Sequence, residues 1–230
     1  MELHPVGVSG VLAVLGDAIS EETGARVAAL SAAVRDAHIP GVTEMIPAYA
    51  SLLIKYDPFL TDYALLSDRV RALEKSILSA SAQEGRVVDI PVCYGGKYGE
   101  DLPFVASHAG LSEKEVIALH AGKTYRIYML GFLPGFPYLG GLDKRLFTPR
   151  LDTPRTRIPA GSVGIGGQQT GIYPMESPGG WQLIGRTPLM LFAPGQPLLY
   201  AAGDRIRFVP IEEKEFEEIR RKEEARVHGA

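Results

Sequence analysis

The residues best suited to chemistry lie between positions 131 and 187, where arginines follow a run of prolines, glycines and aromatic side chains. A guanidinium group stays charged and can bind a carboxylate or a phosphate through two parallel hydrogen bonds. Aromatic rings supply apolar walls, and a cleft with such walls and a few polar anchors is the usual form of a small-molecule site. The pattern therefore predicts a cleft for an anionic substrate or a nucleotide. Its predicted binding residues are Arg150, Arg155, Gln169, Tyr173, Trp181 and Arg186.

The run GFLPGFPYLGG at residues 131–141 opens this region. Prolines stiffen a backbone path, and glycines let the backbone approach a ligand or another strand closely. We expect the run to follow a barrel strand and to form one wall of the cleft near a partner contact. In the alternative interpretation, the prolines and glycines only shape barrel corners, and the aromatic residues fill the core.

His120 is the candidate catalytic residue. It lies at the end of a predicted helix, just before a predicted strand over residues 124–132. An imidazole titrates near neutral pH, so it could shuttle a proton in the reaction. The alternative is a histidine at a helix terminus that contacts backbone carbonyl groups.

Other motifs resemble known sites but lack an essential part. Gly122-Lys123-Thr124 ends like a phosphate-binding loop, but that motif needs a glycine where Ile117 stands. Residues 161–167 contain no complete dinucleotide-binding motif. Cys93 is the only cysteine, which excludes an internal disulfide, and no His, Cys and carboxylate cluster has metal-ligand spacing. The sequence therefore predicts no intrinsic metal ion and no covalent cofactor.

Composition excludes several classes of protein. The net charge is −3 and the sequence pI is about 6.0, so nothing favours nucleic acid as a partner. No apolar run approaches the ~20 residues of a membrane span. The N-terminus lacks the basic start and apolar stretch of a signal peptide. We therefore expect a cytoplasmic protein that contacts no membrane.

Residues 1–85 are predicted to form a small α+β domain. The expected order is β-α-β-β-α, and a final strand is expected at 86–92. Ser20 is the expected N-cap of the first helix, and Thr61 or Asp62 that of the second. The predicted segments are strands at 10–15, 42–48 and 50–56, a helix from Ser20 to about His38, and a second helix through Ile77.

Residues 86–230 have a different pattern of residue types from residues 1–85, and this pattern predicts a mainly-β domain. Short β-prone segments are interrupted by Gly or Pro every 8–12 residues, which is typical of an antiparallel barrel or sandwich. Ser112 and Glu115 have the spacing of a capping box, which predicts one helix that ends at Gly122. The charged tail over 211–226 predicts a solvated C-terminal helix.

Several long motifs occur in a distinctive order, and they give the chain a family resemblance. They are GFLPGFPYLGGLD, PR-x₃-PR, IPAGSVGI, QTGIYP, SPGGW and IGRTP. With them the chain resembles the allophanate hydrolase subunit 1-like family. That family includes the B subunit of bacterial ATP-dependent 5-oxoprolinase, a sporulation-kinase inhibitor and the first half of biotin-dependent urea carboxyltransferase.

The resemblance implies a cyclophilin-like β-barrel over residues 86–230. It also implies two partners, a subunit-2-like C protein and a lactam-utilisation-type A protein. The implied activity is that of an amidohydrolase subunit that acts only with these partners. The complex would open the ring of 5-oxo-L-proline to L-glutamate with hydrolysis of ATP, which normally brings Mg²⁺.

Two other functions stay open at the level of sequence. The chain could be a regulatory protein that docks on a histidine kinase and inhibits it. It could also be half of a biotin-dependent carboxyltransferase, with biotin supplied by a separate carrier.

Overall fold

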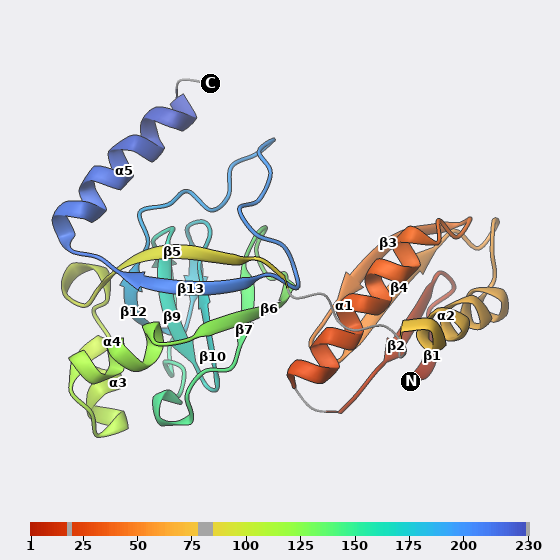
Figure 1. Cartoon of the computed structure of the whole chain (residues 1–230), viewed down its shortest axis with the longest axis horizontal. Coiled ribbons are helices and arrows are strands. Elements are labelled where there is room, and N and C mark those ends of the chain that lie inside the picture. Colours follow the sequence, from red (N-terminus) through yellow and green to blue (C-terminus); the bar gives the residue numbers. More distant parts are fainter. Residues whose placement is uncertain (18–19, 78–84, 229–230) are drawn as a thin grey trace. The chain divides into compact units, whose positions relative to one another are not determined.

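The structure is a computed structural model that describes residues 1–17, 20–77 and 85–228 (Figure 1). The chain forms two compact units, Met1–Glu84 and Gly85–Ala230. Each unit has its own hydrophobic core. Over the described ranges, none of the helices has the length and apolar character needed to cross a membrane.

The first unit is a four-stranded antiparallel sheet with two helices. The strand order is β1-β2-β4-β3, so the first strand lies at one edge and the third at the other. The elements are β1 (Glu2–Val6), β2 (Gly10–Val14), α1 (Glu21–Asp36), β3 (Val42–Pro47), β4 (Ser51–Tyr56) and α2 (Tyr63–Ile77).

Local sequence explains most of these boundaries. Ser20 caps α1, and its side chain accepts a hydrogen bond from the Thr23 backbone amide at 3.1 Å, as predicted. Asp62 caps α2 in the same way through the amide of Leu65 at 2.8 Å. The predicted strand pair is confirmed as β3 and β4. Sequence analysis did not predict β1, which pairs with β2 over five residues of each strand.

The second unit is built around a closed β-barrel, which confirms the prediction of a mainly-β domain. Neighbouring strands follow the order β10-β7-β6-β13-β5-β12-β9, and β10 closes the barrel against β9. The barrel strands are β5 (Val87–Tyr94), β6 (Thr124–Leu130), β7 (Pro137–Gly140), β9 (Ser162–Gly166), β10 (Gln169–Ile172), β12 (Gln182–Arg186) and β13 (Arg205–Pro210).

One barrel pairing differs from the predicted antiparallel pattern. Strands β13 and β5 run parallel, whereas the other barrel pairs are antiparallel. A parallel pair needs a long connection between its strands. Here the connection contains all the other barrel strands. Outside the barrel, β8 (Arg155–Ile158) and β11 (Ser177–Gly179) form a small sheet of two strands.

Three α-helices accompany the barrel within the described residues, and two of them, α3 (Leu102–Ala109) and α4 (Glu113–Ala121), pack together (Figure 1). The predicted capping box begins α4, because the Ser112 amide donates to Glu115 at 2.8 Å while the Glu115 amide donates to the Ser112 hydroxyl. Sequence analysis missed α3.

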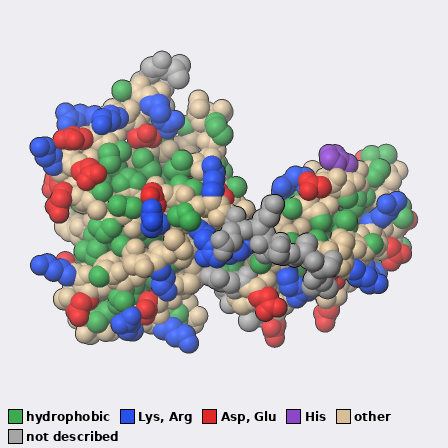
Figure 2. Space-filling view, viewed as in Figure 1, with side chains coloured by type: hydrophobic (Ala, Val, Ile, Leu, Met, Phe, Trp, Pro, Cys, Tyr) green, Lys and Arg blue, Asp and Glu red, His purple; other side chains and the backbone are tan. Residues whose placement is uncertain are grey.

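The C-terminal helix α5 (Glu213–His228) is more firmly attached than a purely solvated tail. Phe216 is 2% exposed and packs with Tyr98 and Cys93. The Tyr98 hydroxyl also donates a hydrogen bond to Glu217 at 3.0 Å. On the face shown in Figure 2, positive and negative side chains are interspersed around groups of hydrophobic side chains.

Candidate functional site

Two predicted site residues, Tyr173 and Trp181, form one packed cluster with Phe136 of the 131–141 run. The rings of Phe136, Tyr173 and Trp181 meet edge to face, with centroids 5.4–6.3 Å apart. Each side chain is at most 5% exposed. Tyr173 and Trp181 thus agree with the alternative interpretation that the aromatic residues fill the core, because both rings are buried in packing contacts. Contact between these two residues and a ligand stays a prediction.

Two glycines, Gly166 in β9 and Gly171 in β10, make room for this packing. A Cβ atom on Gly166 would lie 2.4 Å from Nε1 of Trp181, and one on Gly171 would lie 3.0 Å from the same ring. A side chain at Gly166 would therefore displace the indole, and one at Gly171 would press tightly against it. The glycines of β9 and β10 let Trp181 lie against the barrel strands, whereas the sequence had suggested close approach to a ligand or a strand without deciding between them.

The run at residues 131–141 forms the turn after β6 and then the whole of β7. Its Phe132 has a φ of 66°, a rare conformation for an aromatic residue. The Phe132 side chain is 64% exposed and touches the buried Phe136 edge to face at 5.6 Å. The expectation that this run follows a barrel strand is confirmed, and its role in a cleft wall stays a prediction.

Arg150 lies on the outer side of the aromatic cluster. Its guanidinium carbon is 5.7 Å from the centre of the Trp181 ring, a cation–π arrangement. Two hydrogen bonds fix the segment that carries it, from Leu151 to Gly180 at 2.7 Å and from Gln182 to Pro149 at 2.9 Å. The side chain is exposed, and it forms no ion pair with any residue that the structure describes.

The charge of Arg150 also acts on the neighbouring phenols. Burial raises the pKa of Tyr138 and of Tyr173, and the positive charge of Arg150 opposes that rise at both residues. A positive charge without a carboxylate partner, held against a ring, suits a carboxylate or phosphoryl oxygen. Arg150 is therefore the predicted anion-binding residue that the geometry supports best.

Arg155 is engaged in ion pairs with two carboxylates, and its predicted role in anion binding stays a prediction. Its Nη2 donates to both carboxylate oxygens of Asp101, at 2.8 and 2.9 Å, and its Nε lies 3.0 Å from Glu100. The side chain is only 23% exposed. Two carboxylates already neutralise this guanidinium, so its geometry is that of a structural clamp. Asp101 also accepts a 2.6 Å hydrogen bond from the Leu183 amide, which ties the start of α3 to β12.

His120 lies fully buried inside the barrel unit. Its Nε2 lies 2.8 Å from the Thr170 hydroxyl, and its Nδ1 lies 2.8 Å from the Tyr94 hydroxyl. Burial lowers the pKa of His120 to about 3. A neutral imidazole without solvent access is a core residue, so the geometry gives no support to the predicted proton shuttle. The alternative of a helix-terminal histidine that contacts backbone carbonyl groups does not describe the ring either. Its nitrogens contact the hydroxyls of Tyr94 and Thr170, and the ring stacks on Phe208 with centroids 4.5 Å apart.

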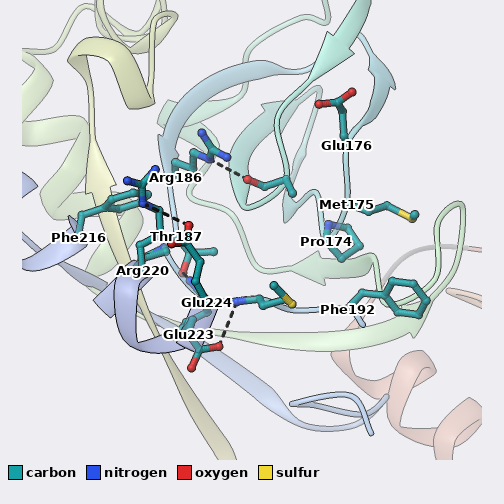
Figure 3. A pocket seen from close by; sticks show the side chains of 14 residues that line it. Pro174, Met175, Glu176, Arg186, Thr187, Phe192, Phe216, Arg220, Glu223 and Glu224 are labelled. Carbon is teal, nitrogen blue, oxygen red and sulfur yellow. Dashed lines mark hydrogen bonds and ion pairs between the residues drawn. The ribbon is translucent and has the colours of Figure 1, made fainter. Parts of the chain in front are cut away.

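Arg186 takes part in none of the ring contacts of the aromatic cluster. Arg186 lines a pocket against α5, where its Nε donates to the Ala160 carbonyl at 2.7 Å (Figure 3). Gln169 begins β10 and is half-buried. The structure therefore brings Arg150, Arg155, Tyr173 and Trp181 into one neighbourhood but does not gather all the predicted residues around one hollow.

Sequence analysis did not predict the two carboxylates that pair with Arg155, nor the arginine of α5 that lies near Arg186. Asp101 and Glu100 precede Arg155 by more than fifty positions, and Arg220 lies in the charged tail. No local motif marks any of the three. Among the described residues, no group of three or more His, Cys, Asp or Glu side chains is arranged to hold a metal ion.

Comparison with known proteins shows which family the chain resembles. The family model for the carboxyltransferase domain, subdomain C and D, matches residues 1–199. A 5-oxoprolinase B subunit of Bacillus subtilis (strain 168) is 43% identical over 227 residues, which cover 94% of this chain and 95% of that protein. A 5-oxoprolinase B subunit of Escherichia coli O157:H7 is 48% identical over 180 residues, which cover 76% of this chain and 81% of that protein.

Other similarities reach longer proteins. The crystal structure of TTHA0988 aligns with a TM-score of 0.79 at 42% identity, over 89% of this chain and 40% of that one. This chain thus spans two fifths of that protein. A urea amidolyase of Saccharomyces cerevisiae is 27% identical over 84% of this chain, a match that covers 12% of its own length.

Proposed function

The chain belongs to the carboxyltransferase domain family, subdomain C and D, and within it to the B subunits of 5-oxoprolinase; from this we propose that it is a non-autonomous subunit of an ATP-dependent 5-oxoprolinase. The observation that carries the proposal is the 43% identity to one such B subunit along nearly the full length of both chains. The proposed partners are the subunit-2-like C protein and the lactam-utilisation-type A protein. We also propose that the barrel is cyclophilin-like and that the complex is cytoplasmic.

The proposed reaction explains why an unpaired arginine is useful. A lactam carbonyl is a poor electrophile, and its ring nitrogen is a poor leaving group. Transfer of the γ-phosphoryl group of ATP to the amide oxygen makes the carbon easier to attack and the C–N bond easier to break. One water attacks this carbon and the C–N bond breaks, which leaves the amine and an acyl phosphate. A second water hydrolyses the acyl phosphate, so that glutamate and phosphate are released alongside the ADP formed in the first step. Such chemistry needs cations near phosphoryl oxygens and a grip on the substrate carboxylate.

In this proposal Arg150 binds one of those anions. Its guanidinium is exposed, positioned by the Trp181 ring and free of carboxylate partners among the described residues. Arg155 supports the same region indirectly, because it pairs with Asp101, the N-cap of α3, and donates a hydrogen bond to the Trp181 carbonyl at 3.4 Å. ATP and Mg²⁺ enter as substrates of the assembled complex.

Reconstitution tests the proposal. The purified chain is mixed with the C and A proteins from the same organism, then supplied with ATP, Mg²⁺ and 5-oxo-L-proline. We expect stoichiometric glutamate and ADP from the full mixture and none when any one component is omitted. A stable complex of all three folded proteins that forms no glutamate would overturn the proposal.

A second function has some support from the family itself. The family model is named for a carboxyltransferase domain, and the match to a urea amidolyase extends over 84% of this chain. If the chain is half of a carboxyltransferase, a carboxyl group would be transferred from a biotinylated carrier protein only when this chain is present. Carboxyl transfer without any 5-oxoproline cleavage would favour this second function.

A further inference from the structure

The indole of Trp181 lies with one face on the barrel. A Cβ atom on Gly166 would lie 2.4, 2.5 and 2.6 Å from Nε1, Cδ1 and Cε2 of this ring. These three similar distances place Gly166 under the face of the ring, because a point beyond the N–H bond would lie clearly farther from the two carbons than from the nitrogen. The N–H bond lies in the plane of the ring, so Gly166 does not block it.

The backbone around this indole is also fixed. The Leu151 amide donates to the Gly180 carbonyl at 2.7 Å, and Arg155 donates to the Trp181 carbonyl at 3.4 Å. The ring meets Phe136 edge to face, with centroids 5.5 Å apart. The direction of the indole N–H bond is therefore set before a ligand arrives, which lowers the entropic cost of binding.

The indole N–H is a donor that the protein itself leaves unmatched. Trp181 is 5% exposed, and its Nε1 donates to no residue that the structure describes. The N–H of a buried tryptophan usually has a hydrogen-bond partner, because an unpaired buried donor costs free energy. A ligand with an acceptor atom at this edge of the ring would supply that partner.

A second unmatched donor lies over the same ring. The guanidinium carbon of Arg150 is 5.7 Å from the ring centre, and this arginine pairs with no carboxylate in the described part of the chain. Arg155, the other arginine nearby, is already matched by Asp101 and Glu100. The ring of Trp181 thus has one charged donor above it and one neutral donor at its edge.

This combination distinguishes between the two kinds of anion in the proposed reaction. A triphosphate carries several negative charges and is bound by several cations, Mg²⁺ and backbone amides. A carboxylate carries one charge, which a single guanidinium matches with two parallel hydrogen bonds. In 5-oxo-L-proline the carboxylate and the ring carbonyl flank the same nitrogen atom, so a charged donor beside a neutral donor complements them.

We propose that Arg150 binds the carboxylate of 5-oxo-L-proline and that the indole N–H of Trp181 donates to its lactam oxygen. The indole then selects a cyclic amide over a cyclic amine, and the arginine selects an acid. An amide oxygen has two lone pairs, so one stays available for phosphoryl transfer. The identity of the acid rests on the proposed function, whereas the pairing of a carboxylate with a neighbouring neutral acceptor rests on the two donors.

The indole N–H can itself report on this contact. Trp181 is the only tryptophan, so the chain labelled with ¹⁵N gives a single indole N–H resonance. The labelled full-length chain is assembled with unlabelled C and A proteins without ATP. This complex is titrated separately with 5-oxo-L-proline, 2-pyrrolidinone, L-proline, and ATP with Mg²⁺.

Two variants test the charge. Arg150→Ala removes the proposed carboxylate ligand, and Arg157→Ala is the matched control at an exposed arginine that pairs with Glu176. Circular dichroism checks that both variants are folded. Both replaced side chains are exposed, so we expect both variants to fold.

We expect 5-oxo-L-proline to move the indole proton resonance downfield and to saturate the shift. Arg150→Ala should weaken this binding by at least about tenfold, as for loss of a charge-assisted hydrogen bond, with Arg157→Ala within about twofold of wild type. The lactam without a carboxylate, 2-pyrrolidinone, should also bind at least about tenfold more weakly. L-Proline, which lacks the ring carbonyl, should cause no downfield shift.

Three results would overturn this assignment. The first is an unchanged indole resonance in a complex that cleaves 5-oxo-L-proline, which leaves the proposed function standing. The second is displacement of 5-oxo-L-proline from this resonance by ATP with Mg²⁺, since Arg150 would then bind phosphoryl oxygens. The third is equal affinity of the Arg150 and Arg157 variants for 5-oxo-L-proline.

Failure of the proposed function gives a different result. A complex that shows the expected shift but forms no glutamate when ATP is added refutes the function and leaves the binding site standing. A complex that shows neither the shift nor glutamate refutes both.

Discussion

Lowering the pH from 8 to 5 is expected to destabilise the barrel unit through His120. The hydrogen-bond directions around this ring follow from its neighbours. The Thr170 hydroxyl donates to the Gly164 carbonyl at 3.0 Å, so it accepts from Nε2–H of His120. Nδ1 is then the acceptor for the Tyr94 hydroxyl. Protonation would place an uncompensated charge in the core and would require Tyr94 to turn its hydroxyl away.

The magnitude follows from the two pKa values. Burial lowers the pKa of His120 from its ordinary value of 6.5 to about 3 in the folded state. Between these values the unfolded chain binds more protons than the folded one, so stability rises with pH across this window. The histidine does not weaken folding above pH 6.5, and the free energy of unfolding falls by about 1.4 kcal/mol per pH unit below it. At pH 5 the loss is about 2 kcal/mol.

Urea unfolding followed by tryptophan fluorescence measures this loss, because Trp181 is the only tryptophan in the chain and lies in the barrel unit. The control is His120→Gln, which removes the titrating group. The variant should be less stable at pH 8 by about 1–3 kcal/mol, since it leaves a buried partner unsatisfied. The stability difference between wild type and variant should then shrink by about 2 kcal/mol at pH 5. Parallel pH profiles would refute the reasoning and would mean that His120 can be protonated in the folded state.

Three substitutions test the site. Arg150→Ala should lower turnover of the reconstituted complex at least tenfold. It should cost no more than about 1 kcal/mol of stability, because an exposed cation–π contact is weak. Arg157→Ala, at another exposed arginine, is the control, and equal turnover in both variants would refute the anion-binding role of Arg150. Arg155→Ala should destabilise the barrel by about 2–4 kcal/mol, because it leaves the largely buried Asp101 carboxylate uncompensated; a shift in urea midpoint worth less than about 0.5 kcal/mol would contradict the clamp. Gly166→Ala should cost about 1–3 kcal/mol and shift the emission of Trp181, since the new Cβ would lie 2.4 Å from the indole nitrogen; an unchanged emission spectrum would show that the ring does not depend on this glycine.

Sequence reasoning worked where a feature depends on nearby residues. The Ser20 cap and the capping box at Ser112 are both present, because each joins groups three positions apart. Strands β3 and β4 follow from their composition and the turn between them. Helix α3 was missed because its sequence, LPFVASHA, spans only eight residues and its N-cap Asp101 makes no side-chain capping hydrogen bond. Pro103 in its first turn is a helix-start signal that the sequence analysis did not use. Strand β1 was missed because its burial pattern is almost uniformly exposed, which removes the alternation that marks a strand.

The site could also be predicted only in part: its residue types follow from the sequence, but its contacts between distant residues do not. The sequence predicted arginines beside aromatic side chains. In the structure Arg150 does lie against the Trp181 ring. The sequence could not distinguish Arg150 from Arg155, because both occur in the same proline-rich stretch. Only the fold brings Asp101 against Arg155 and leaves Arg150 without an acidic partner in the described part of the chain.

The amino-acid sequence alone determined the family, the local caps and the chemical types available for a site, since these depend on residue identity and on short-range spacing. Tertiary structure decided which of those groups are accessible. Arg155 meets a carboxylate 54 positions away, and His120 meets a hydroxyl 50 positions away. Ionisation and ligand binding depend on solvent access and on charges within a few ångströms, and a chain of this length sets those distances only when the barrel closes.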